Sequence, residues 1–133
     1  MYNKPAFTIL SAELSTLGPN ENASRTKFLE LQLRQAGADY AHVSGVYRGT
    51  AEASFIVFHT PRVTGAVLRR LAYAYEQESV LEVSGGARRV ASLVYLDDER
   101  EEACGEFQRV DDIDGLDAYT EASPGLYYAC VAN

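Results

Sequence analysis

Short runs of alternating apolar and polar residues recur along the chain and predict five β-strands. In the first run, Phe7 and Ile9 share one side of the strand, and the turn-forming residues 18–20 follow it. The predicted strands are residues 6–14, 40–48, 51–59, 80–83 and 89–96. Two of the segments between these strands carry a helical period instead.

The first predicted helix begins within residues 22–24 and ends at Gly37, a residue typical of helix C-terminal caps. In the second predicted helix, Thr60 is the expected N-cap and Pro61 the first helical residue. Proline suits this position because the first N–H groups of a helix have no partner within the helix, and proline has no N–H. This helix is expected to end around Gln77. Its apolar face repeats every four residues: Val63, Val67, Leu71 and Tyr75.

The order β-α-β-β-α-β predicts one α+β domain over residues 1–133, a ferredoxin-like sandwich with two helices on one face of an antiparallel sheet. The acidic tail after Asp97 ends in GLYYACV, which fits one added edge strand. A sheet covered on one face is normally polar on the other. Both faces of the central hairpin are apolar here, with Phe55 and Val57 on one and Ile56 and Phe58 on the other. We therefore expect other subunits to cover the second face.

Composition narrows the classes of function. With 133 residues, 47% of them hydrophobic, the chain can bury one core. A net charge of −7 argues against a general nucleic-acid binder, although an acidic surface also fits a DNA mimic. Cys104 and Cys130 form no metal-ligand or redox motif, and no phosphate-binding glycine loop occurs. No segment is apolar enough for a signal peptide or a membrane span, which predicts a cytoplasmic protein without metal or cofactor.

One pair of polar side chains is expected on the central hairpin. If Gly49-Thr50 forms a type II′ turn, Tyr47 lies directly opposite Glu52, on the same face and within side-chain reach. The phenol and the carboxylate then form one site. The same spacing also fits an ordinary cross-strand pair.

Glu76 and Gln77 end the second predicted helix. A solvated helix end accounts for both residues, but Gln77 directly precedes a buried strand and is the better candidate to point inward. His42 and His59 have no spacing that indicates a metal site or a catalytic dyad.

An ordered set of segments resembles the phage S-adenosylmethionine-degrading enzymes, or SAMases. The resemblance covers most of residues 7–110. Its segments are TILSAELS (8–15), N-x-S-R (22–25), SGVYR (44–48), EASFIVF (52–58), RLAYAYEQESVLEV (70–83), SLVYL (92–96) and FQRV (107–110).

The resemblance implies a homotrimer of ferredoxin-like (PII-like) sandwiches with active sites between subunits. It also implies that Glu52 is essential and assisted by Tyr47, and that Gln77 belongs to the substrate site. Glu76, beside Gln77 at the helix end, is a further candidate for substrate binding. Family members place a longer loop between the tyrosine and the glutamate, whereas four residues intervene here.

The implied activity is that of an S-adenosylmethionine lyase, which forms 5′-methylthioadenosine and L-homoserine lactone in the host cytoplasm and so counters restriction-modification. The alternatives are a hydrolase that forms homoserine, a PII-like nucleotide-binding trimer without turnover, and an acidic DNA mimic.

Overall fold

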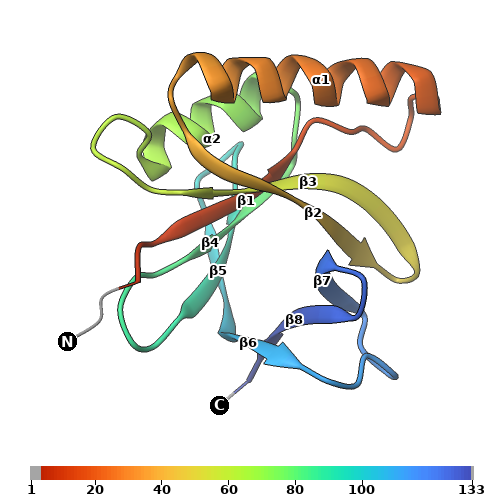
Figure 1. Ribbon diagram of the computed structural model, residues 1–133, viewed down its shortest axis with the longest axis vertical. Coiled ribbons are helices and arrows are strands. Elements are labelled where there is room, and N and C mark those ends of the chain that lie inside the picture. The colour runs from red at the N-terminus through yellow and green to blue at the C-terminus, as the bar shows by residue number, and fades with distance from the viewer. Residues whose placement is uncertain (1–3, 133) are drawn as a thin grey trace.

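The sheet of this protein closes on itself. The computed structural model describes residues 4–132, and within them the chain forms eight strands and two helices (Figure 1). The elements are β1 (Phe7–Ser11), α1 (Pro19–Gln35), β2 (Asp39–Tyr47), β3 (Thr50–Phe58), α2 (Gly65–Ala74), β4 (Ser79–Val83), β5 (Val90–Tyr95), β6 (Glu101–Val110), β7 (Ala118–Ser123) and β8 (Leu126–Val131). The strands form a closed antiparallel barrel in the order β1-β3-β2-β7-β8-β6-β5-β4.

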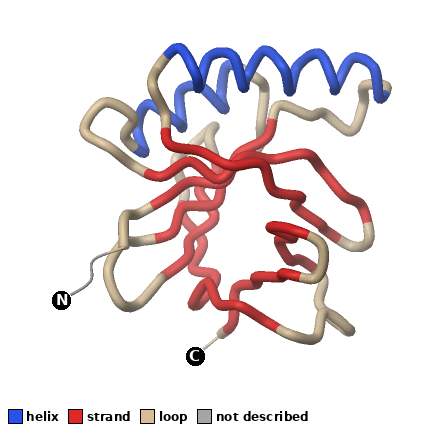
Figure 2. The backbone as a smooth tube through the Cα atoms, in the orientation of Figure 1, coloured by secondary structure: helices blue, strands red, loops and turns tan. Residues whose placement is uncertain are grey.

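The predicted ferredoxin-like sandwich is therefore wrong, and the tail is the reason. Residues 101–131 supply three strands rather than one edge strand. β6 pairs with β5, and β7 pairs with β2, so both strands that would border an open five-stranded sheet have a partner. Closure removes exposed strand edges and encloses an interior (Figure 2).

The barrel wall separates two apolar cores. Both helices lie on one side of the barrel, where Phe55 and Val57 of β3 are fully buried against them (Figures 1 and 2). Ile56 and Phe58 point the other way, into a second cluster inside the barrel with Phe7 of β1. Both apolar faces of the hairpin are thus covered by other parts of the same chain. The oligomer that we expected from these faces stays a prediction.

The helix ends differ in part from those expected. Gly37 follows the first helix with a φ of 71°, as a C-terminal cap requires. The second helix starts one turn later than predicted, because the Thr64 hydroxyl accepts the Val67 N–H at 3.3 Å and caps it. The Thr60 hydroxyl accepts the Val63 N–H at 3.1 Å and closes only the preceding turn. No helix within residues 4–132 is both long and apolar enough to cross a membrane.

The hairpin between β2 and β3 has a different turn from the one predicted. Arg48 and Gly49 are its central residues, with φ values of 48° and 82°, which is typical of a type I′ turn. Tyr47 consequently pairs with Thr50, and Glu52 pairs with Gly45, so the predicted direct pairing of Tyr47 with Glu52 is wrong. Tyr47 and Glu52 still share a face as diagonal neighbours, because side chains alternate with a period of two.

Candidate active site

A cavity of about 790 Å³ occupies one end of the barrel interior. This volume is typical of small-molecule sites. Apolar side chains such as Leu81, Leu93 and Phe107 make up much of its wall. Polar groups from separate elements are placed among them: Ser11, Tyr47, Glu52, Gln77, Ser79, Asp117 and Thr120.

Glu52 contributes a carboxylate to this cavity. It lies near the start of β3 and is half-buried; Gly45, its partner across the hairpin, has no side chain. Burial raises the pKa of Glu52, and the negative charge of Glu13 raises it further, while the nearby Ser11 hydroxyl acts in the opposite direction. These surroundings disfavour the ionised carboxylate, and a cationic ligand beside it would offset that cost.

The backbone beside Glu52 is fixed from the end of β1. The Ser11 hydroxyl donates to the Ala53 carbonyl at 2.8 Å and accepts the Glu13 N–H at 3.0 Å. The Glu13 carboxylate accepts the Ala53 N–H at 2.8 Å. Both backbone groups of Ala53 are therefore held by side chains, which positions the neighbouring Glu52.

Gln77 joins the second helix to the same region. Its amide nitrogen donates to the Glu13 carbonyl at 2.9 Å and to the Tyr75 carbonyl at 3.4 Å. The Arg25 guanidinium of α1 also donates to the Tyr75 carbonyl and, at 2.6 Å, to the Ala12 carbonyl. Gln77 and Arg25 thus connect the end of β1 to both helices behind the cavity.

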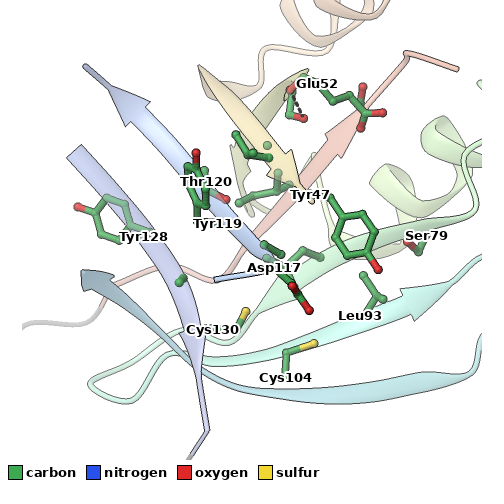
Figure 3. Close-up of a pocket in the computed structure, with 18 of the residues that line it drawn as sticks. Tyr47, Glu52, Ser79, Leu93, Cys104, Asp117, Tyr119, Thr120, Tyr128 and Cys130 are labelled. Atoms are coloured by element: carbon green, nitrogen blue, oxygen red, sulfur yellow. Dashed lines mark hydrogen bonds between the residues drawn. The ribbon is translucent and has the colours of Figure 1, made fainter. Parts of the chain in front are cut away.

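Tyr47 lies at the cavity rim, at the end of β2. The residue is 58% exposed, and the Arg48 guanidinium carbon lies 5.1 Å from the centroid of its ring. Figure 3 shows Tyr47 and Glu52 among the lining residues. Their common face and common cavity bring them together without the direct pairing that the sequence had indicated.

Glu76 has a different position from the other three predicted residues. It is absent from the cavity lining, its side chain is 72% exposed, and its carboxylate lies 3.6 Å from the Arg25 guanidinium. With a φ of 62°, Glu76 occupies the left-handed position that ends α2. The structure therefore gathers Glu52, Tyr47 and Gln77 around one cavity and leaves Glu76 outside it.

Sequence reasoning missed the part of the wall that the tail contributes. Asp117, Tyr119 and Thr120 line the cavity from β7 and the loop before it, and Tyr128 lines it from β8 (Figure 3). The alternation in AYTEAS and LYYACV was the available signal, but the acidic stretch that precedes both of them, residues 111–117, obscured it.

Two free thiols, those of Cys104 and Cys130, also belong to this wall (Figure 3). Burial raises the pKa of the Cys130 thiol to about 11, with a smaller contribution from Cys104. Cys130 is therefore a protonated thiol at neutral pH and acts as part of the wall rather than as a nucleophile.

The fold and the cavity define a β-barrel protein whose interior holds a cavity of small-molecule size beside a half-buried carboxylate. The sequence model of the S-Adenosylmethionine lyase family matches residues 8–131, and the chain belongs to this family. The match covers every strand except the first residue of β1, the tail strands included. No curated protein matches the chain. The family makes this protein an S-adenosylmethionine lyase, with S-adenosylmethionine as its substrate.

Proposed function

We propose that this protein cleaves S-adenosylmethionine inside the barrel to 5′-methylthioadenosine and L-homoserine lactone. The observation that carries the proposal is the convergence of Glu52, Tyr47 and Gln77 on one largely apolar cavity. These residues come from β3, β2 and the end of α2, and the family supplies the substrate.

The substrate contains both reacting groups. One oxygen of its carboxylate attacks Cγ, the Cγ–sulfur bond breaks, and the electron pair of that bond goes to sulfur as a neutral thioether. No proton transfer, water or protein nucleophile is needed. The enzyme has to hold the methionine moiety bent, so that carboxylate and Cγ are in contact. The negative carboxylate and the positive sulfonium neutralise each other in this step, so apolar walls favour the transition state over the separated charges.

Each of the three residues has a proposed role. Glu52 binds the substrate ammonium, which fixes the bend of the methionine chain. Tyr47, at the rim, orients the substrate carboxylate or lies beside the sulfonium. Gln77 supports Glu52 through its hydrogen bond to the Glu13 carbonyl. Glu76 was a fourth candidate for substrate binding, and its ion pair with Arg25 supports a role at the helix end instead.

Hydrolysis to homoserine is the second candidate, because the raised pKa of Glu52 suits a general base that activates water. A second carboxylate, that of Glu13, lies near Glu52. It already accepts the Ala53 N–H, so it is engaged in holding the backbone. The lyase reaction requires neither group to transfer a proton, and for this reason we prefer it.

The biological role we infer is removal of S-adenosylmethionine in the cytoplasm, that of the host cell if the gene belongs to a phage, which deprives restriction-modification systems of their methyl donor. We also propose that the protein assembles as a homotrimer. This assembly is supported by three large apolar side chains that are exposed on the helical side of the barrel: Phe28 and Leu31 on α1, and Tyr73 on α2. Light scattering coupled to size-exclusion chromatography measures the assembly.

The reaction is tested by chromatography of the purified protein incubated with S-adenosylmethionine. The lyase forms methylthioadenosine, and lactone precedes homoserine. An absence of methylthioadenosine would exclude both the lyase and the hydrolase and would favour a nucleotide-binding protein or a DNA mimic. Homoserine without prior lactone would exclude only the lyase.

A further inference from the structure

A second cavity, of about 530 Å³, occupies the opposite end of the barrel. Its position follows from the strand register. The first cavity contains Ser11 and Glu52, whereas the second contains Phe7 and Phe58, at the other ends of β1 and β3. Both cavities share the side chains of Phe107, Thr120 and Tyr128, which form a common wall.

The second cavity concentrates positive charge in an acidic protein. Lys4, Arg89 and Arg109 line it, and its lining includes no carboxylate, although the chain has a net charge of −7. Among residues 4–132, neither Lys4 nor Arg109 makes an ion pair. The lining residue His42 is hydrogen-bonded to the Glu30 carboxylate of α1 at 3.0 Å.

One of these cations is held in place. The Arg89 guanidinium donates to the Pro5 carbonyl at 2.8 Å, and its central carbon lies 5.0 Å from the centroid of the Phe7 ring. These contacts keep its charge at the cavity without requiring the side chain to reorganise when a ligand binds.

Aromatic rings build the rest of the wall. Phe7 makes edge-to-face contacts with Phe58 and Phe107, at centroid distances of 5.8 Å and 5.3 Å. Phe107 is stacked parallel to Tyr128 at 5.4 Å. A packed set of rings offers a flat apolar surface beside the cationic groups.

We propose that this second cavity binds a small organic anion, in which a flat apolar body carries a carboxylate, sulfonate or phosphate. The aromatic wall takes the apolar body, and Lys4, Arg89 and Arg109 take the anionic group. The two ends of the barrel then differ in the sign of the charge that they accept. Glu52 faces a cationic substrate at one end, and three cations face an anion at the other.

The test uses two fluorescent probes that differ chiefly in charge, 8-anilinonaphthalene-1-sulfonate and neutral N-phenyl-1-naphthylamine, titrated into the full chain. We expect the sulfonate to bind with one-to-one stoichiometry and at least about tenfold more tightly than the neutral probe. Arg109→Glu is expected to weaken sulfonate binding about tenfold or more, whereas Arg109→Lys keeps it within about threefold.

Arg62→Glu is the matched control, because Arg62 is an exposed arginine that lines neither cavity. We expect it to change sulfonate binding by less than about twofold. Lys4→Glu gives an independent measurement at the exposed start of the described chain. Circular dichroism melting confirms that each variant is folded. The proposal is overturned if the sulfonate does not bind, if the neutral probe binds as tightly, or if both cavity variants behave like Arg62→Glu.

Discussion

Replacing Glu52 with glutamine removes the carboxylate charge from the cavity and leaves its shape nearly unchanged. Because the pKa of Glu52 is raised in the folded protein, the folded state favours the protonated form. The ionised group therefore costs stability above its folded pKa, and this cost disappears as the pH falls through that pKa. Glu52→Gln is expected to be at least as stable as the wild type at pH 7, with a difference that vanishes in acid.

The expected loss of activity follows from the proposed contact with the substrate ammonium. Removing one partner of a buried, hydrogen-bonded charge pair costs about 2–5 kcal/mol. Glu52 is only half-buried, so we expect the lower part of that range, about 2–3 kcal/mol. This corresponds to a fall in kcat/KM of about 30- to 160-fold.

The assay is the initial rate of methylthioadenosine formation, measured by chromatography over a range of substrate concentrations. Urea denaturation of the same preparations measures their stability. Glu101→Gln is the matched control, because Glu101 is an exposed carboxylate of β6 that lines neither cavity. A Glu52→Gln enzyme within about threefold of the wild-type kcat/KM would refute the role of this carboxylate. A loss of activity accompanied by a loss of stability would show that the substitution disrupts the fold, which would refute the claim that it removes only the charge of Glu52.

Four further changes test the surroundings of the site. Glu13→Gln removes a negative charge that raises the pKa of Glu52, so the acidic limb of the pH profile of kcat/KM is expected to move to lower pH. An acidic limb at the wild-type pH would contradict the electrostatic coupling between Glu13 and Glu52. Gln77→Ala loses the hydrogen bond to the Glu13 carbonyl and is expected to lower the free energy of unfolding by about 1–2 kcal/mol together with kcat/KM, measured by urea titration and kinetics. Glu76→Gly relieves the strain of a left-handed backbone position and is expected to raise the free energy of unfolding by up to about 1 kcal/mol. Its kcat/KM is expected to stay within about twofold of the wild-type value, and a large loss of activity would indicate that Glu76 contacts the substrate. Gly105→Ala places a Cβ against the Val131 carbonyl oxygen at a φ of 91° and is expected to lower the free energy of unfolding by about 2–4 kcal/mol, measured by urea titration. Gly115→Ala, with open space around the added Cβ, is expected to cost about 1 kcal/mol, and equal costs at the two positions would contradict the packing of β6 on β8.

The elements of the first part of the chain were predictable because their patterns are local. Alternation placed β1 to β5 within a few residues of their observed bounds, and Gly37 marked the end of α1. The start of α2 was misplaced because Thr60 and Thr64 each have an N-cap hydroxyl, and nothing local decides which of them begins a helix.

Closure of the barrel was not predictable from these patterns. It depends on pairing β2 with β7 and β5 with β6, and the strands of the first pair lie far apart in the sequence. β6 carries acidic residues and a break in register, so its alternation is weak. An apolar hairpin face indicates that something covers it, but not whether the cover is another subunit or the tail of the same chain.

The candidate site was predictable where one strand face defines it. Glu52 and Tyr47 share a face under the predicted register and under the observed one, since the shift preserved the alternation. The tail residues Asp117, Tyr119 and Tyr128 reach the cavity only through closure of the barrel. Glu76 and Gln77 are adjacent in the sequence, and the left-handed turn at Glu76 sends only Gln77 toward the cavity.

The central claim is that the substrate carboxylate, and not water, displaces the sulfonium inside the barrel. Incubation in ¹⁸O-labelled water, followed by mass spectrometry of the homoserine, tests it directly. Intramolecular attack predicts an unlabelled lactone, whose later hydrolysis places the label in the carboxylate and leaves the γ-hydroxyl unlabelled. Label in the γ-hydroxyl would show that water attacked Cγ, and it would contradict the account.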